Sequence, residues 1–260
     1  MAPADTPGFS PKPDPVVQPL SLKDKRVLVT GGTTGIGRAC VLALAQAGAR
    51  ILTFGRHQAE LDDTLKDARA QNGRVFGLTA DVALRDDVER VFTEVDRQLG
   101  GLDILVNNAA VKIGTVQDTA EDEWRYAVET DFVGYLACAK AAIDRLQDKG
   151  GHLVFIGSLA AEAKGPSTSV YAGIKAGIET YAKTLRKELI DKNIRVSVVE
   201  PGLVGADLQG IPVEQQRERE GKREMIYAED IADAVCFVLT RPERTSVSLI
   251  QVEPIKQKSV

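Results

Sequence analysis

The sequence is poor in the residues that cross-link small proteins or bind metals, with only three cysteines and two histidines among 260 residues. Cys40, Cys138 and Cys236 are far apart, and each lies in an apolar stretch of helical period. We therefore expect reduced core thiols and no disulfide framework. His57 and His152 show no ligand pattern with Cys, Asp or Glu, so no metal site is predicted.

An excess of positive charge is also absent, because 33 Lys and Arg face 37 Asp and Glu, for a net charge of −4. This balance disfavours a nucleic-acid or membrane partner, since anionic surfaces select basic proteins. No apolar run approaches the ~18 residues of a membrane span. The N-terminus does not show the charged, apolar and small-residue order of a signal peptide, so we expect a cytoplasmic protein.

Proline is concentrated at the start of the chain. Six prolines fall within the first twenty residues: Pro3, Pro7, Pro11, Pro13, Pro15 and Pro19. This density fixes φ repeatedly and removes amide donors, so residues 1–22 are predicted to form an extended arm. The arm is either a loose tail or a segment laid on a neighbouring subunit. Residues 23–260 are predicted to be one domain, because a chain of this length with 43% hydrophobic residues buries one core.

From residue 25 onward, short apolar runs alternate with amphipathic segments of helical period, which is typical of βαβ units. Most of the runs are continuously apolar, as expected for strands that helices cover on both faces. Seven strands are predicted, at residues 26–30, 51–54, 74–80, 103–107, 152–157, 195–200 and 248–252. The sequence therefore predicts an α/β fold with a seven-stranded parallel sheet and helices on both faces.

A glycine-rich loop, Thr30-Gly31-Gly32-Thr33-Thr34-Gly35-Ile36-Gly37, follows the first predicted strand and precedes a helical stretch at residues 38–47. Glycine lets the backbone turn sharply and approach a pyrophosphate, while the free amides of the following helix attract its charge. The loop predicts a dinucleotide site and a Rossmann-type doubly wound fold. Its expected contacts are Gly31, Thr33, Thr34, Gly35, Ile36 and Gly37. A tight turn without a ligand is the alternative interpretation.

The spacing of this loop, T-G-x-x-x-G-x-G, resembles that of the short-chain dehydrogenase/reductase family, and the resemblance extends over residues 24–252. Asp81-Val82 is similar to the family's adenine-contacting pair. Residues 107–110 are similar to its N-N-A-G motif, with Ala110 in place of the glycine. The resemblance implies that Asp81, Val82, Asn107 and Ala109 contact the cofactor.

The end of the second predicted strand bears on which cofactor is used. In the family an acidic residue there would hold the ribose hydroxyls of NAD, whereas this chain has Gly55 followed by Arg56. A guanidinium offers paired donors to a 2′-phosphate, and no carboxylate at position 55 repels that group. The predicted cofactor is therefore NADP or NADPH. Alternatively, Arg56 is a solvated loop cation.

Tyr171 and Lys175 form a Y-x-x-x-K pair on a predicted helix, and Ser158 ends the fifth strand thirteen residues before Tyr171. Residues at i and i+4 share a helix face, so the Lys175 ammonium is expected to favour the phenolate of Tyr171. The resemblance implies that Tyr171 protonates a carbonyl oxygen as hydride arrives, while Ser158 holds that oxygen. It also implies cofactor contacts for Tyr171 and Lys175. Any one of the three alone could be a core or surface residue.

Asp131 departs from the family pattern, which has a catalytic asparagine there, supporting a water between the lysine and solvent. An aspartate could hold the same water and accept from Lys175, and its charge would shift the pH dependence of the proton relay. Pro201, Gly202 and Val204 are similar to the P-G motif that borders the nicotinamide. The threonine expected two residues beyond Val204 is replaced by Ala206.

The last third of the chain resembles the serine and 3-hydroxy acid dehydrogenase branch through residues 200–205, 228–232 and 254–257. This resemblance implies small polar alcohols or aldehydes as substrates, and a substrate lid at residues 203–227. The lid carries four cations among glutamates: Arg217, Arg219, Lys222 and Arg223. One of them could meet an anionic substrate group, or all could belong to a solvated helix face.

Apolar stripes on residues 119–149 and on the helix after Ser169 either cover the chain's own sheet or pair across subunits, as in family members. The resemblance therefore implies a homotetramer or a dimer. It also implies an NADP-dependent oxidoreductase acting on a small-molecule carbonyl or alcohol. The alternatives are a serine or 3-hydroxy acid dehydrogenase working in the oxidative direction, and a non-catalytic NADP(H)-sensing or scaffold protein of the same fold.

Overall fold

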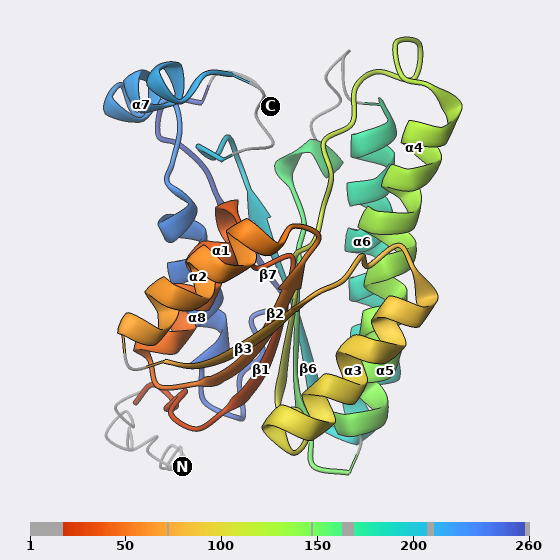
Figure 1. The fold of residues 1–260 in the computed structure, drawn as a ribbon, viewed down its shortest axis with the longest axis vertical. Helices are drawn as coiled ribbons and strands as arrows, with labels where there is room; N and C mark the ends of the chain where they lie inside the picture. Colours follow the sequence, from red (N-terminus) through yellow and green to blue (C-terminus); the bar gives the residue numbers. More distant parts are fainter. Residues whose placement is uncertain (1–17, 72, 147, 163–168, 207–210, 258–260) are drawn as a thin grey trace, which may run out of the picture.

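The computed structural model describes residues 18–257, except 72, 147, 163–168 and 207–210. Seven parallel strands form one sheet in the order β3-β2-β1-β4-β5-β6-β7 (Figure 1). They are β1 (Arg26–Thr30), β2 (Arg50–Gly55), β3 (Arg74–Thr79), β4 (Ile104–Asn107), β5 (Gly151–Ile156), β6 (Ile194–Pro201) and β7 (Leu249–Val252). The predicted seven-stranded parallel sheet is confirmed, and each strand end lies within one residue of its expected position.

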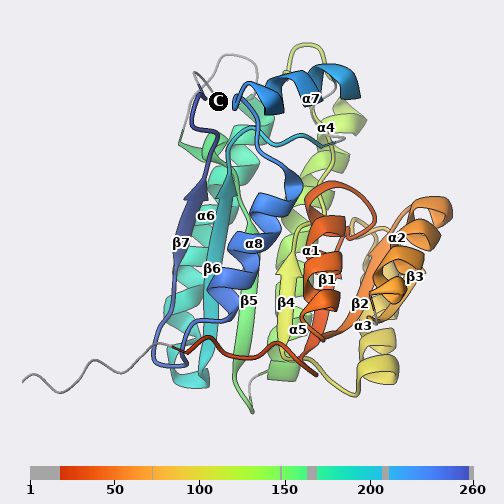
Figure 2. The same cartoon turned by 90° about the vertical axis from the view of Figure 1, so that its left-hand side faces the viewer.

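Helices cover both faces of the sheet, which makes this a single-domain Rossmann-type fold (Figure 1). On one face lie α1 (Gly35–Gln46), α2 (Gln58–Ala70) and α8 (Ala228–Leu239). On the other face lie α3 (Arg85–Leu99), α5 (Gly134–Leu146) and α6 (Ser169–Glu188). The strand arrows point toward α4 (Glu121–Val128) and α7 (Val213–Gly221), so both helices lie at the carboxyl end of the sheet (Figure 2).

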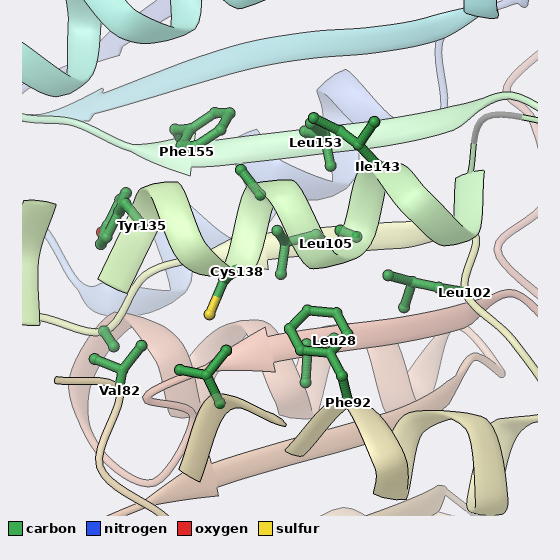
Figure 3. Close-up of a cluster of buried hydrophobic side chains, with 14 of the residues drawn as sticks. Leu28, Val82, Phe92, Leu102, Leu105, Tyr135, Cys138, Ile143, Leu153 and Phe155 are labelled. Carbon is green, nitrogen blue, oxygen red and sulfur yellow. The ribbon is translucent and has the colours of Figure 1, made fainter. Parts of the chain in front are cut away.

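Each face of the sheet has its own hydrophobic core. Beneath α3, α5 and α6, Leu28, Phe92, Leu105, Cys138 and Phe155 are buried together (Figure 3). The opposite core contains Cys40 and lies under α1, α2 and α8. All three thiols are free, as expected, and burial raises the pKa of Cys138 to about 12.

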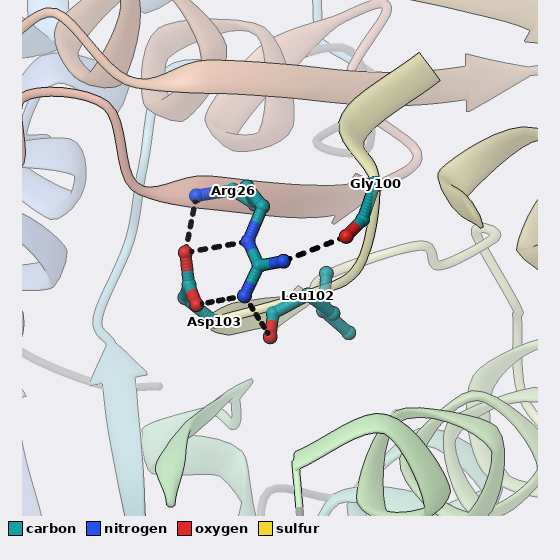
Figure 4. A network of polar contacts seen from close by, with 4 residues as sticks. All are labelled: Arg26, Gly100, Leu102 and Asp103. Atoms are coloured by element: carbon teal, nitrogen blue, oxygen red, sulfur yellow. Dashed lines mark hydrogen bonds and ion pairs between the residues drawn. The ribbon is translucent and has the colours of Figure 1, made fainter. Parts of the chain in front are cut away.

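The amino end of β1 is tied to the turn before β4 by Arg26 (Figure 4). Its guanidinium donates to both carboxylate oxygens of Asp103, at 3.0 and 2.5 Å. It also donates to the carbonyls of Gly100, at 2.8 Å, and Leu102, at 3.4 Å. The Arg26 amide completes the contact with a 2.8 Å hydrogen bond to Asp103. This network fixes the register of two central strands at the end opposite to α4 and α7.

The predicted arm, residues 1–22, lies mostly outside the described residues. Its last residues contact the domain: the Leu20 amide donates to the Thr240 carbonyl at 2.8 Å, and Leu22 is buried in the core under α1 and α8. Among the helices within the described ranges, none is long and apolar enough to cross a membrane.

The apolar stripe expected on the helix after Ser169 covers the chain's own sheet. Ile174, Ile178, Leu185 and Leu189 are buried in the core with residues of β5 and β6. The 119–149 segment is divided into α4, a π-helix η1 (Glu129–Val133) and α5. Pairing of these helices across subunits stays a prediction.

Candidate active site

The crevice for a ligand lies where strand order reverses. Because β1 pairs with β2 on one side and β4 on the other, the loops after β1 and β4 diverge at the carboxyl end of the sheet. A cavity of about 220 Å³ opens there. Its walls come from the segments that follow each of the first six strands and from the start of α6.

The glycine loop packs its backbone directly against the segment after β4. Gly31 has a φ of +62°, and a Cβ at that position would lie 2.7 Å from the Cα of Ala109. Helix α1 begins at Gly35, and the preceding Thr34 is extended, with no hydrogen bond from its side chain to the first turn. The first amides of α1 are thus left for a ligand, and Gly35, Ile36 and Gly37 line the cavity. This arrangement fits a pyrophosphate.

Arg56 and Asp81 line the end of the cavity that belongs to β2 and β3. Tyr126, from α4, joins them: the Arg56 guanidinium donates to its hydroxyl at 3.0 Å, and this hydroxyl lies 2.5 Å from a carboxylate oxygen of Asp81. A Cβ at Gly55 would lie 2.6 Å from a methyl carbon of Thr33. An acidic side chain at position 55 would therefore press on the glycine loop.

Of the four residues predicted for catalysis, Ser158, Tyr171 and Lys175 line the same cavity, whereas Asp131 does not. The Lys175 ammonium donates to the Ile156 carbonyl at 3.1 Å and lies 5.6 Å from the centre of the Tyr171 ring. Ser158 is buried, and its hydroxyl oxygen accepts from the Ala160 amide at 3.2 Å. That contact leaves the hydroxyl hydrogen of Ser158 available to a ligand.

Lys175 is almost fully buried among groups that favour its charge. Burial alone would lower the pKa of this ammonium, but Tyr135, Tyr171 and Asp131 together raise it above its ordinary value. The Tyr135 ring centre lies 5.4 Å from the ammonium nitrogen, and its hydroxyl donates to the Ile156 carbonyl at 3.3 Å. Lys175 therefore stays protonated, and its ammonium is held in position by the Ile156 carbonyl where the side chain lines the cavity.

Asp131 lies in the π-helix η1, behind the cavity wall, and is fully buried. One carboxylate oxygen accepts from the Val111 amide at 2.8 Å, while the other has no hydrogen-bond partner among the described residues. Burial raises the pKa of Asp131 to about 6, although Lys175 and the Val111 amide act in the opposite direction.

The segment after β6 borders the opposite wall through Pro201, Gly202, Val204 and Ala206. The C-terminal segment supports it, because the side-chain carbonyl of Gln257 accepts from the Leu203 amide at 2.8 Å. Within the expected lid, Lys222 pairs with Glu218 at 2.6 Å, and Arg219 lies 3.9 Å from Glu224. These pairs favour the solvated helix face for both cations. The part of the lid at residues 207–210 lies outside the described residues.

The structure places nearly all of the predicted cofactor residues around one cavity. Those that line it are Gly31, Thr33, Thr34, Gly35, Ile36, Gly37, Arg56, Asp81, Val82, Ala109, Tyr171, Lys175, Pro201, Gly202 and Val204. Asn107 was also expected to contact the cofactor, but it does not line the cavity. Its fully buried amide donates to the Tyr135 carbonyl at 2.8 Å and therefore joins β4 to α5. Ala110, the substituted position of the N-N-A-G motif, also lines the cavity.

Three residues with structural roles at the site were not predicted. Asn108 donates to the carbonyls of Thr30 and Gly31, at 3.0 and 3.1 Å, and so holds the glycine loop. The Tyr126 hydroxyl contacts Arg56 and Asp81, and the Tyr135 hydroxyl shares the Ile156 carbonyl with the Lys175 ammonium. The N-N-A-G motif was a signal for Asn108, whereas the two tyrosines lie on helices where sequence periodicity indicates only an apolar stripe.

The histidines differ in their surroundings. His57 lines the cavity, whereas His152 is buried with Nε2 2.8 Å from the Ser197 hydroxyl. Burial lowers the pKa of His152 to about 3, so this ring is neutral. In the part of the chain that the structure describes, no three His, Cys, Asp or Glu side chains are grouped as metal ligands.

Comparison with known proteins agrees with this geometry. The sequence model for short chain dehydrogenases matches residues 25–217. An uncharacterized oxidoreductase of Staphylococcus aureus is 29% identical over 236 residues, which cover 90% of this chain and 99% of the relative. A Burkholderia cenocepacia short chain dehydrogenase in complex with NADP superimposes with a TM-score of 0.81, at 28% identity and over 90% and 98% of the two chains. Actinorhodin polyketide ketoreductase with NADPH gives 0.80 at 25% identity, over 90% and 98%. The chain therefore belongs to the short chain dehydrogenase family and is an oxidoreductase.

Proposed function

We propose that this oxidoreductase uses NADP(H) and interconverts a carbonyl group and an alcohol on a small molecule, with Tyr171 as the acid and base. The observation that carries this proposal is that Ser158, Tyr171 and Lys175 line the same cavity as the glycine loop. A dinucleotide site and a proton donor thus share one solvent-accessible space, as hydride transfer coupled to proton transfer requires.

The residues around the cavity fit this cofactor, which would supply or accept the hydride. The uncapped start of α1 suits the pyrophosphate. At the far end, Arg56 offers a guanidinium to a 2′-phosphate, and a side chain at position 55 would crowd Thr33 of the glycine loop. The two related structures solved with NADP and NADPH support the same choice.

The chemistry proposed for the other end follows from the side chains there. In reduction, Tyr171 donates its proton to the carbonyl oxygen while the Ser158 hydroxyl donates a hydrogen bond to that oxygen. The buried Lys175 ammonium then stabilises the phenolate that remains. Oxidation of an alcohol would use the same groups in reverse, with Tyr171 as the base.

The first test measures thermal stability with NADPH and with NADH, followed by turnover on a panel of aldehydes, ketones and 3-hydroxy acids. A bound cofactor raises the melting temperature by mass action. We expect NADPH to stabilise the protein more than NADH. We also expect Tyr171→Phe to keep that stabilisation while losing at least about a hundredfold in turnover. Stabilisation by NADH alone contradicts the proposed cofactor, and unchanged turnover in Tyr171→Phe contradicts the proposed acid.

A further inference from the structure

We infer that Tyr126 is a specificity-determining residue that holds Arg56 in place for the 2′-phosphate of NADP(H). This inference rests on the proposed cofactor. Tyr126 belongs to α4, whereas Arg56 and Asp81 follow β2 and β3, so three separate segments meet at this end of the cavity. The Tyr126 hydroxyl is the atom at which they meet.

The direction of both hydrogen bonds follows from the chemistry of the partners. A guanidinium only donates, so the Tyr126 oxygen accepts from Arg56 at 3.0 Å. An ionised carboxylate only accepts, so the same hydroxyl donates to Asp81 at 2.5 Å. The three groups form a directed chain in which each bond polarises the next, and a phenylalanine at position 126 breaks both links.

The hydroxyl keeps the proton that this chain needs. Burial and the neighbouring Asp81 raise the pKa of Tyr126 above its ordinary value, and Arg56 only partly opposes them. Tyr126 is half-buried, whereas Arg56 is exposed. The tyrosine can therefore restrain the mobile arginine side chain through its hydroxyl. Its ring also lies beneath the Arg56 guanidinium, whose central carbon is 5.7 Å from the ring centre.

Asp81 is itself firmly placed. One of its carboxylate oxygens accepts from the Ala83 amide at 3.0 Å. Its own amide donates to Asp87 at 2.7 Å, and Asp87 pairs with Arg90 at 2.6 Å. The support for Tyr126 therefore extends into the start of α3 and does not depend on a mobile side chain.

The contact with Tyr126 occupies only one arm of the Arg56 guanidinium. Within the described residues, the remaining donors of Arg56 make no hydrogen bond. They are left to a phosphate that enters the cavity, and a guanidinium pairs with such an anion through two parallel N–H groups. A free arginine side chain would lose much rotamer freedom on binding, whereas one already held loses less.

This arrangement predicts an effect on one part of the cofactor alone. Tyr126 acts through Arg56, so its hydroxyl matters for ligands that carry a 2′-phosphate. Ligands without a 2′-phosphate would occupy the same end of the cavity but would not pair with the Arg56 guanidinium. The ratio of the two affinities therefore isolates the contribution of Tyr126 from any general change in the pocket.

The experiment measures the dissociation constants of adenosine 2′,5′-bisphosphate and 5′-AMP by calorimetry, for wild type and for Tyr126→Phe. We expect the preference for the bisphosphate to fall about three- to tenfold in Tyr126→Phe, with little change for 5′-AMP. Tyr181→Phe is the matched control, because the Tyr181 ring packs edge-on against Phe155 in the core. This control should keep the wild-type ratio.

A double-mutant cycle with Arg56→Ala then tests the route of the effect. In that background Tyr126→Phe should no longer change the ratio, because the group it holds is gone. If wild type shows no preference for the bisphosphate, the proposed NADP(H) dependence fails. If wild type prefers it and Tyr126→Phe keeps the full preference, the inference is overturned. It is overturned as well if both ligands weaken equally, or if the effect persists without Arg56.

Discussion

The Asp131 carboxylate accepts a hydrogen bond from the Val111 amide at 2.8 Å through one oxygen and leaves the other without a partner among the described residues. An asparagine at this position would keep the first contact and carry no charge. The aspartate instead places a buried, half-satisfied carboxylate near the Lys175 ammonium. The consequences for stability depend on pH.

Asp131→Asn should therefore change how stability varies with pH. Burial raises the pKa of Asp131 from 3.8 to about 6, so the folded protein holds this proton more tightly than the unfolded chain. The free energy of unfolding then falls as pH rises from about 4 through about 6. Between about pH 4.5 and 7.5 the loss from this group is about 2 kcal/mol. We expect urea denaturation to show this loss in wild type but not in Asp131→Asn. Parallel curves for the two proteins would disprove the assignment.

Tyr135→Phe should impair turnover more than cofactor affinity. The Tyr135 hydroxyl and the Lys175 ammonium share the Ile156 carbonyl, and the ring remains against the ammonium in this variant. We expect the loss of one buried hydrogen bond to cost about 1 kcal/mol in unfolding free energy. Turnover should fall about fivefold, because about 1 kcal/mol of the positioning of Lys175 is lost.

The measurement for Tyr135→Phe is steady-state kinetics beside NADPH titration, with Tyr181→Phe as the control. A fall in NADPH affinity with unchanged turnover is the outcome that contradicts a role in positioning Lys175. An equal loss of turnover in Tyr181→Phe would show only that core tyrosines matter for folding.

The sequence was sufficient to place the strands, because each is a nearly continuous apolar run bounded by polar or glycine residues. It was also sufficient to predict that Gly31, Tyr171 and Lys175 belong to one site, since each is part of a motif with fixed local spacing, and all three line the cavity. It did not reveal the π-helix η1, because residues 119–149 show one continuous helical pattern. That pattern does not record which backbone carbonyl each amide selects.

The hydroxyl contacts of Tyr126 and Tyr135 were equally inaccessible to sequence analysis. Tyr126 meets residues 70 and 45 positions away, and Tyr135 meets one 21 positions away. Such contacts depend on how α4 and α5 lie over the sheet, which periodicity does not specify. Asn107 shows the reverse case, because its motif suggested a cofactor contact while packing places its side chain behind the cavity.

Asp103→Asn should destabilise the protein most at neutral pH. Burial would raise the pKa of Asp103, but the hydrogen bonds from Arg26 lower it below its ordinary value. The stabilisation from this pair is therefore present above about pH 4 and is lost as pH falls further. We expect Asp103→Asn to cost about 2 kcal/mol in unfolding free energy at pH 7.

The control for this prediction is Asp144→Asn, which breaks an exposed pair with Lys140 on α5. Because solvent screens that pair, its loss should cost less than about 0.5 kcal/mol. Urea denaturation of both variants at pH 7 and near pH 3 makes the comparison. Equal costs for the two variants at pH 7 would show that the Arg26 network is no more stabilising than a surface pair.

Gly31→Ala should disrupt both the loop and cofactor binding. Gly31 has a positive φ of +62°, and an added Cβ would lie 2.7 Å from the Cα of Ala109, which is backbone and cannot swing aside. We expect a loss of about 3 kcal/mol in unfolding free energy from backbone strain and overpacking together. Gly173→Ala on α6 is the matched control, because within the described residues its added Cβ would have no contact within 4 Å beyond its chain neighbours and the backbone of its own helix. Helix propensity should make that variant up to about 1 kcal/mol more stable.

Thermal melts with and without NADPH should show stabilisation by the cofactor in Gly173→Ala and none in Gly31→Ala. If NADPH stabilises Gly31→Ala as strongly as wild type, the cofactor does not depend on the close packing of this loop.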